Sequence, residues 1–169
     1  MRNTRADVVD AALRVLDAHG LENCSMRRVA AELGVQVSAL YHHVPDKQTL
    51  LAHMADVIVQ HVRGDDPASL CRSLRAALLA VRDGAEVVAT ASAFRLGASE
   101  VEARLAALVG ADGARTLLLY VFGQAQATQT QLQAYALGAL PGYTRGDPAG
   151  EAERGFDRGV AIILAGLER

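Results

Sequence analysis

Residues 25–44, SMRRVAAELGVQVSALYHHV, decide the fold of this chain. Ser25 predicts the start of a short helix, because its hydroxyl can accept a hydrogen bond from a free backbone amide of the first turn. Gly34 predicts the end of that helix, because glycine tolerates the left-handed conformation with which many helices end. A second short helix follows, with Ser38 as its expected N-cap. Helix, tight turn and helix form the helix-turn-helix pattern, whose second helix can lie in a DNA major groove.

The apolar residues of this stretch are spaced so that its two helices pack together. The inner faces are expected to consist of Val29, Ala30 and Leu33 in the first helix, and of Ala39, Leu40 and Val44 in the second. Tyr41, His42 and His43 fall on the more exposed side, with His43 expected to be the more buried histidine. Pro45 ends the second helix, because proline disfavours a helical conformation of the residue before it.

The longer stretch SMRRVAAELGVQVSALYHHVPDKQTLL resembles the DNA-binding domain of the TetR family of transcriptional regulators. The resemblance rests on the turn AELGV, on LYHHV in the second helix, and on DKQTLL, which opens a longer helix. Residues 74–89 and 158–168 resemble parts of the effector domain of the tetracycline repressors. The resemblance implies a cytoplasmic bacterial repressor that binds a palindromic DNA operator as a homodimer and is released by a small molecule.

Hydrophobic periodicity predicts helices along the whole chain, so the expected fold class is all-α. A three-helix DNA-binding domain is expected over residues 1–45, a connecting helix over 46–64, and a ligand-binding and dimerisation domain over 65–169. The helices expected outside the motif cover residues 4–19, 46–62, 68–82, 85–93, 100–109, 114–137 and 150–168, with a turn at 110–113 and a loop at 138–149. Their predicted N-terminal caps include Thr4, Asp46 and a capping box of Ser99 with Glu102.

The composition favours a helical protein that buries much apolar surface. Of its 169 residues, 51% are hydrophobic and 4% aromatic, and the mean hydropathy is +0.14. Such a chain often buries apolar area in a dimer interface or a ligand pocket. No continuous apolar run reaches the roughly 18 residues of a membrane span, so no membrane partner is expected. Cys24 and Cys71 lack metal-ligand spacing and are expected to be free thiols.

The net charge of −2 does not indicate a generally basic nucleic-acid binder. Residues 1–63 hold seven Arg and Lys residues and seven Asp and Glu residues, which balance. Positive charge for DNA must therefore be local. Arg27, Arg28 and Lys47 lie beside the second motif helix in the sequence, and Arg2 and Arg5 lie on an N-terminal arm that could reach a DNA phosphate.

Nine residues of the motif and its flanks are candidate DNA contacts: Arg27, Arg28, Gln36, Val37, Ser38, Ala39, Tyr41, His42 and Lys47. Arg27 and Arg28 begin the first motif helix, where free amides and cations favour phosphate. The resemblance assigns Arg27 a base edge instead, since arginine binds guanine bidentately. Val37 and Ala39 could meet thymine methyl groups, and Ser38 could contact either base class. Tyr41, His42 and Lys47 match the family's phosphate clamps.

Two long apolar helices, residues 114–137 and 150–168, are the expected dimer surface. Gly155, Gly159 and Gly166 would permit close helix approach there. In the family, the corresponding pair forms a four-helix bundle with its mate. The alternative is that these helices form ordinary intramolecular core.

An effector cavity is expected between the helices at 68–82, 85–93 and 114–137. Its candidate lining residues are Leu70, Leu74, Leu78, Val88, Ala91, Phe94, Leu117, Tyr120 and Gln124. Leu70, Val88 and Ala91 stand where the tetracycline repressors carry an Asn that holds the drug, a His that coordinates its Mg²⁺, and a Thr. Apolar side chains supply no oxygen ligands for Mg²⁺. The sequence therefore predicts an apolar or aromatic effector and no metal or other cofactor.

Other function classes receive less support from the sequence. No Ser-His-Asp set, paired carboxylates or Gly-rich phosphate loop indicates an enzyme, and Asp83 beside Gly84 reads as a helix end rather than a general base. A transcriptional activator of the same fold remains an alternative. So does a helical protein–protein module that has lost DNA binding, although Arg27, Tyr41 and Lys47 argue against this.

Overall fold

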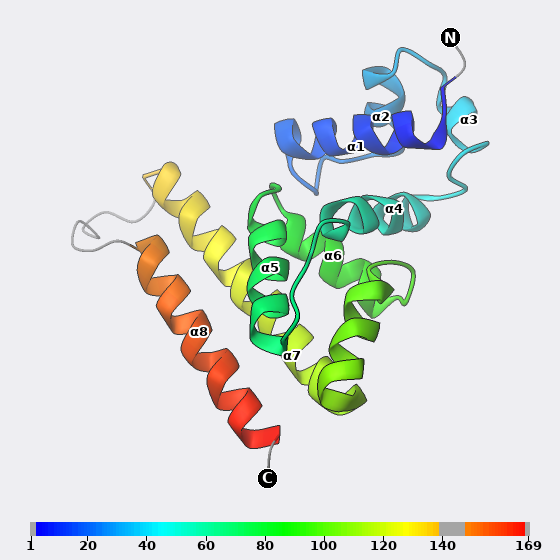
Figure 1. Ribbon diagram of the computed structural model, residues 1–169. Coiled ribbons are helices and arrows are strands. Elements are labelled where there is room, and N and C mark those ends of the chain that lie inside the picture. The colour runs from blue at the N-terminus through cyan, green and yellow to red at the C-terminus, as the bar shows by residue number, and fades with distance from the viewer. Residues whose placement is uncertain (1–2, 139–147, 168–169) are drawn as a thin grey trace.

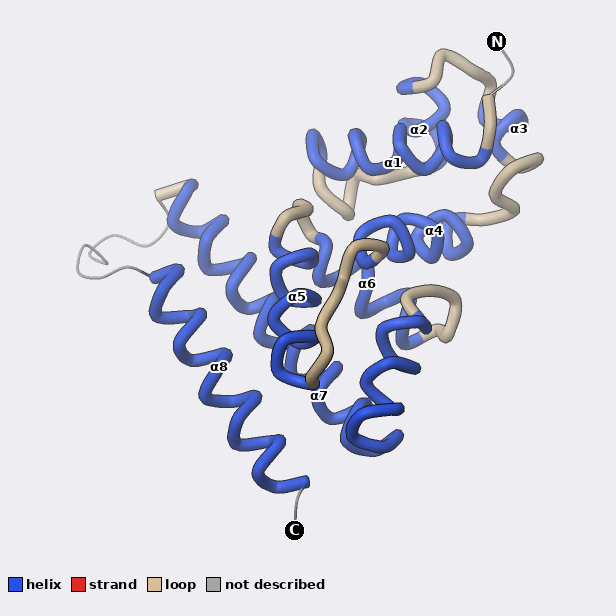
Figure 2. Tube along the Cα trace, in the orientation of Figure 1, coloured by secondary structure: helices blue, strands red, loops and turns tan. Residues whose placement is uncertain are grey.

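The computed structural model describes residues 3–138 and 148–167, and these residues form eight helices and no strand. The helices are α1 (Arg5–His19), α2 (Met26–Glu32), α3 (Val37–Leu40), α4 (Lys47–Val59), α5 (Pro67–Leu79), α6 (Gly84–Ala93), α7 (Ser99–Ala136) and α8 (Pro148–Leu167) (Figures 1 and 2). The expected all-α fold is confirmed. Arg2 and most of the loop expected at 138–149 lie outside the described residues.

Local capping starts three helices where the sequence predicts. The predicted N-caps accept a hydrogen bond from the amide three residues on: Thr4 from Asp7, Ser25 from Arg28, and Asp46 from Thr49. Gly20 and Gly34 follow α1 and α2 with φ of +75° and +66°, the left-handed region that glycine favours. A cap that was not predicted starts α5, where Asp66 and Ser69 form a capping box.

Two predicted caps are wrong. α3 begins at Val37 after the N-cap Gln36, two residues earlier than expected, so Ser38 lies inside the helix and caps nothing. α7 begins at Ser99 without the expected capping box, after Ala98 with a left-handed φ of +59°. A distant contact sets this start, because the Ala98 amide donates a 2.8 Å hydrogen bond to the Asp56 carboxylate on α4.

The break expected at 110–113 is a single residue. Gly110 has φ +76° and ψ +167°, and helical residues continue on both sides of it. The two helices expected at 100–109 and 114–137 are therefore the two limbs of a bent α7. The freedom of glycine at positive φ makes this sharp bend between the limbs attainable.

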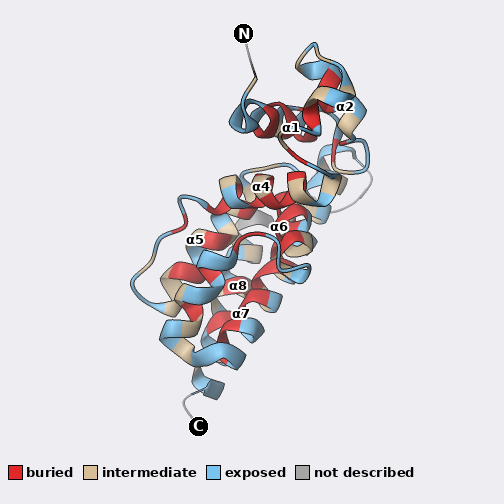
Figure 3. Ribbon diagram, turned by 90° about the vertical axis from the view of Figure 1, so that its right-hand side faces the viewer, coloured by how far each residue is buried: buried red, intermediate tan, exposed pale blue. Residues whose placement is uncertain are grey.

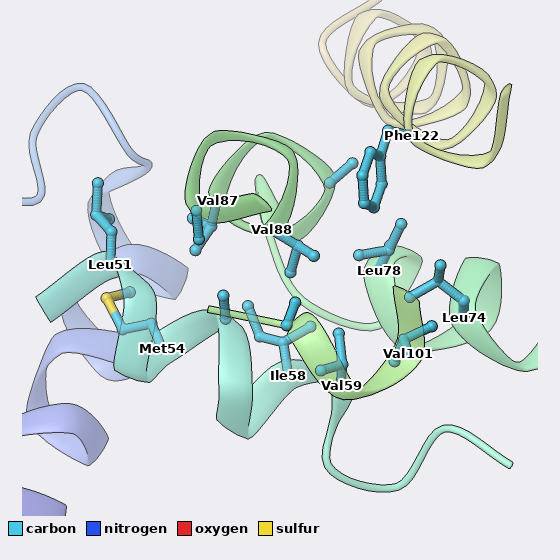
Figure 4. Packing of buried hydrophobic residues seen from close by; sticks show 14 of the residues in the cluster. Leu51, Met54, Ile58, Val59, Leu74, Leu78, Val87, Val88, Val101 and Phe122 are labelled. Atoms are coloured by element: carbon cyan, nitrogen blue, oxygen red, sulfur yellow. The ribbon is translucent and has the colours of Figure 1, made fainter. Parts of the chain in front are cut away.

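The helices form an N-terminal head of α1–α3 and a body of α5–α8, with α4 between them (Figure 1). α4 packs against α1 on one side and α6 on another, and the body is held by contacts of α7 with α5, α6 and α8. Figure 3 shows that buried residues line the faces where these helices meet. Figure 4 shows Leu51 and Met54 toward the head, Ile58 near Val88 of α6, and Val59 near Val101 of α7. One buried cluster thus runs from head to body through α4.

α7 contains a segment that is apolar enough, by length and composition, to cross a membrane, with a window of mean hydropathy 1.5. This contrasts with the absence of such a segment expected from the sequence. The helix bends at Gly110, packs against α5, α6 and α8, and buries 39% of that window. Packing within the body thus accounts for part of its apolar character.

Candidate nucleic-acid interface

The helix-turn-helix is built as the sequence predicts. Val29 of α2 is 0% exposed and Leu40 of α3 is 1% exposed, so both helices bury their inner faces in the core of the head. Two backbone hydrogen bonds close the turn. The Gly34 amide donates to the Ala31 carbonyl at 3.1 Å, and the Val35 amide donates to the Ala30 carbonyl at 3.0 Å. This turn fixes how α3 projects from the head.

The nine candidate DNA contacts lie on α2, on α3 and the residues that flank it, and at the first residue of α4. Six are exposed, namely Arg27, Arg28, Gln36, Ser38, Tyr41 and His42, and three are half-buried, namely Val37, Ala39 and Lys47. Tyr41 is 51% exposed despite its large ring. His43 is half-buried, which confirms that it is less exposed than His42. The structure thus presents all nine side chains at least partly to solvent, and their contacts with DNA stay a prediction.

The cations of this surface are free of acidic partners. The ion pairs within the described residues join Arg14 to Glu32 and Arg72 to Asp157, each at 2.8 Å, and include none of Arg27, Arg28 and Lys47. The acid nearest in sequence to Lys47 is Asp46, whose carboxylate is held by the Thr49 amide at 2.7 Å. That amide lowers the pKa of Asp46. The three cations are therefore available to phosphate.

A hollow of about 280 Å³ separates the start of α1 from α3. It is lined by Asn3, Val8, Val35, Ala39, Leu40, His42 and His43. His42 and His43 thus lie within reach of the N-terminal arm. No local sequence pattern predicted this, since Asn3 and His42 are brought together by packing of α1 on α2 and of α2 on α3.

Most of the predicted effector residues lie in the core of the body. Six are at most 2% exposed: Leu70, Leu74, Leu78, Val88, Ala91 and Leu117. Figure 4 shows Leu74, Leu78 and Val88 close together beside Phe122. Phe94, by contrast, is 59% exposed at the end of α6.

The two remaining predicted effector residues hold α8 against α7. The Tyr120 hydroxyl donates to the carbonyls of Gly155 and Phe156, each at 3.3 Å. The Gln124 amide donates to the Ala152 carbonyl at 3.1 Å, and its oxygen accepts a 2.7 Å bond from Arg75. Desolvation raises the pKa of Tyr120 and lowers that of Arg75, as expected at a packed helix junction.

The open space of the body lies elsewhere. A hollow of about 470 Å³ between α6 and α7 is lined by Ala89, Ser92, Ala93, Arg95, Glu102, Arg115, Leu118, Leu119, Phe122 and Gly123. None of the nine predicted effector residues lines it, although Leu118 and Phe122 flank Leu117 and Tyr120 on α7. Helical periodicity identifies inward faces, and it does not distinguish a filled interior from a hollow one. The predicted effector residues therefore stay a prediction.

Known proteins are similar to this chain either over a part of it or over almost its whole length. The profile of the family described as "Bacterial regulatory proteins, tetR family" matches residues 8–54, that is, the head and the first part of α4. The HTH-type transcriptional repressor DrrR1 of Streptomyces coeruleorubidus is 49% identical over 63 residues, which cover 37% of this chain and 23% of DrrR1. That similarity thus spans less than a quarter of the DrrR1 sequence.

Other relatives match along almost the whole chain. The tetracycline repressor protein class C of Escherichia coli is 29% identical over 98% of this chain and 90% of its own length. The crystal structure of Mycobacterium smegmatis BioQ is 34% identical, with a TM-score of 0.88 over 98% of this chain and 97% of BioQ. A BioQ structure with its double-stranded DNA operator is 32% identical, with a TM-score of 0.82 over 98% of both chains. The chain belongs to the TetR family of bacterial regulatory proteins.

Proposed function

We propose that this protein is a transcriptional repressor that binds a palindromic operator in double-stranded DNA as a homodimer. The observation that carries the proposal is the exposed face of α2 and α3, with unpaired Arg27, Arg28 and Lys47 around the exposed Tyr41. The operator complex of the similar BioQ supports the same role for the head of this chain. In this role, Tyr41, His42 and Lys47 position the head on phosphates, while Arg27 and the start of α3 contact base edges.

A single head reads few base pairs, because α3 is only four residues long. Two heads related by a two-fold axis double the recognised sequence, with half-sites about 34 Å apart or somewhat more. This is the physical reason for proposing a palindromic site and a dimer.

The exposed face of α7 and α8 supports dimerisation. Leu119 on α7 is 64% exposed and Ile162 on α8 is 72% exposed, which leaves large apolar side chains in water in a single chain. Gly159 does not serve this interface, since a Cβ there would collide with the Tyr120 side chain of the same chain. Gly155 and Gly166 have open space around them and remain available for close approach of a second subunit.

An apolar or aromatic effector is proposed to release the operator. A ligand releases DNA only if it binds better to a conformation in which the two heads no longer match their half-sites. α4 is suited to transmit such a change, because it contacts α1 of the head and α6 of the body. Activation in place of repression would use the same contacts, since the sign of regulation depends on where the operator lies.

An electrophoretic mobility shift with the DNA upstream of the protein's own gene tests the proposal. At low salt, the wild type is expected to retard a fragment that contains an inverted repeat, and a variant with both Arg27→Ala and Tyr41→Ala is expected not to. Failure of the wild type to retard any fragment from the neighbouring promoters would contradict DNA binding and favour a protein–protein module.

A further inference from the structure

A second hollow lies at the end of the body that faces the head. It has a volume of about 390 Å³ and is lined by Leu79, Arg82, Gln129, Leu132, Gln133, Ala136 and Leu137. We call it the Arg82 groove. Its residues come from the end of α5, the turn that follows, and the end of α7. Figure 1 shows the turn between α5 and α6 next to the C-terminal end of α1.

The turn between α5 and α6 is bonded directly to the head. The Arg82 guanidinium donates to the carbonyls of Asp17 and Ala18 at the end of α1, at 3.0 and 3.3 Å. The Asp83 carboxylate accepts a 2.8 Å hydrogen bond from the amide of Leu21. A Cβ on Gly20 would lie 3.1 Å from that carboxylate and 3.3 Å from the guanidinium, so glycine permits this close approach.

α7 holds the same turn from the side of the groove. Gln133 donates to the second oxygen of Asp83 at 3.1 Å. Gln129 donates to the carbonyls of Leu78 and Val81, at 3.0 and 2.7 Å. Both glutamines line the groove. Any molecule in the groove thus touches the side chains that fix the turn, and the turn is bonded to α1.

The lining of the groove defines the chemistry that it would bind. Arg82 is the charged member of the lining and is exposed, while Leu132 and Leu137 are 39% and 83% exposed. An apolar wall with one cation complements a small amphipathic anion. The groove volume lies at the lower end of the roughly 300–1,000 Å³ typical of ligand pockets, which fits a molecule of modest size.

We propose that the Arg82 groove binds a small amphipathic carboxylate and that this binding loosens the head from the body. The ligand's apolar part would cover Leu132 and Leu137, and its carboxylate would pair with Arg82. In this structure, that guanidinium donates its hydrogen bonds to uncharged backbone carbonyls of α1. A carboxylate offers this guanidinium a full negative charge and two acceptor oxygens, where each α1 carbonyl offers only a dipole, so the ligand competes with α1 for Arg82.

Binding is tested with two probes, decanoate and 2-naphthoate, by titration calorimetry on the full chain without DNA. At least one probe is expected to bind. Ala136→Trp, which fills the groove, is expected to weaken its binding about tenfold or more, which is about 1.4 kcal/mol. The matched control is Ala93→Trp, which fills the hollow between α6 and α7 and is expected to leave the affinity unchanged.

Charge recognition is tested in the same titration. Arg82→Gln is expected to weaken binding of the carboxylate by about tenfold and to leave the affinity for decanol, its uncharged analogue, unchanged. The proposal is overturned if neither probe binds, if Ala93→Trp and not Ala136→Trp removes binding, or if Ala136→Trp dissociates the dimer in sedimentation, which would assign the groove to the subunit interface.

Loosening of the head is tested by hydrogen exchange. A saturating concentration of whichever probe binds, decanoate or 2-naphthoate, is expected to speed exchange of the Leu21 amide by about fivefold, as the hydrogen bonds of the turn open, and Ala136→Trp is expected to abolish that effect. Unchanged or slower exchange at Leu21 overturns the coupling. These measurements involve no DNA, so their failure is distinct from a failure of operator binding, although the regulatory meaning of the groove rests on the proposed function.

Discussion

The ring of Phe156 on α8 stacks on the ring of Tyr120 on α7, with centroids 5.7 Å apart and planes 18° from parallel. The guanidinium of Arg75 on α5 lies 5.1 Å from the centroid of the Phe156 ring. Phe156 is only 1% exposed, so one side chain joins three helices of the body. α8 is therefore anchored to its own chain at this point.

Truncation of this anchor should destabilise the whole body. We expect Phe156→Ala to lower the free energy of unfolding by about 3–5 kcal/mol, because it removes a buried ring and leaves a cavity. Tyr120→Phe keeps the stack and loses only the hydroxyl bonds, so we expect a loss of about 1 kcal/mol. Urea unfolding at one fixed protein concentration measures both, since a dimer's stability depends on concentration. Equal losses in the two variants would contradict the anchoring role of the ring.

Lys47 should contribute to operator affinity without regard to sequence. If it contacts a phosphate, Lys47→Ala weakens binding to specific and random DNA alike and reduces the slope of log affinity against log salt by about 1. Gln48→Ala, an exposed neighbour, serves as the matched control and should change neither quantity. Fluorescence anisotropy over a salt series measures both. A loss restricted to the specific operator would instead indicate base contact by Lys47.

Arg27 and Arg28 adjoin in sequence and should behave differently. If Arg27 reaches a guanine edge, Arg27→Ala costs about 1–3 kcal/mol on the operator and relaxes preference at one position of each half-site. Arg28→Ala should weaken all sequences uniformly, as loss of a phosphate contact does. Selection of bound sequences from a randomised half-site distinguishes the two. If Arg27→Ala selects the same sequence as the wild type, Arg27 contacts a phosphate and not a base.

Because of Cys71, the free energy of unfolding should fall in alkaline solution. Burial raises the pKa of the Cys71 thiol from 9.0 to about 11. Between these values the folded state keeps a proton that the unfolded state has lost, so stability is present below pH 9 and declines as pH rises toward 11. In Cys71→Ala the decline should be shallower. Urea unfolding at several pH values from 8 upward measures this, and parallel profiles would contradict it.

The same substitution should have opposite effects at two glycines. Gly110 has φ +76° and no atom near its missing Cβ, so Gly110→Ala strains the backbone and should cost about 1 kcal/mol or more. Gly123 lies within the second limb of α7 with equally open space, and Gly123→Ala should stabilise by about 0.5–1 kcal/mol through helix propensity. Thermal unfolding measures both. A stabilising Gly110→Ala would show that the bend of α7 is not required.

Features encoded within a few residues were predictable from the sequence. Thr4, Ser25 and Asp46 start helices where expected, because a side-chain cap needs only the next three residues. The start of α7 was not predictable, because Asp56, far away in sequence, holds the Ala98 amide. The inward faces of the helices followed from their spacing, as the burial of Leu70 illustrates.

The location of open space in the body was not predictable. A leucine that lines a hollow and a leucine in a filled core follow the same helical period, so Leu74 and Leu132 look alike in the sequence. The contact of Arg82 with α1 had no local signal either, since it joins residues more than sixty positions apart. The domain limits expected near residues 45 and 64 stay a prediction.

α4 contributes buried side chains to the cores of both the head and the body. Leu50 and Met54, at most 1% exposed, belong to the buried cluster that includes Val8 and Leu16 of α1, while Ile58 continues the same cluster toward α6. A recombinant head that ended before Lys47 would lack part of its own hydrophobic core. A chimera that joined this head to the body of another protein would have to preserve the packing on both faces of α4. The same requirement holds for any segment exchanged between relatives.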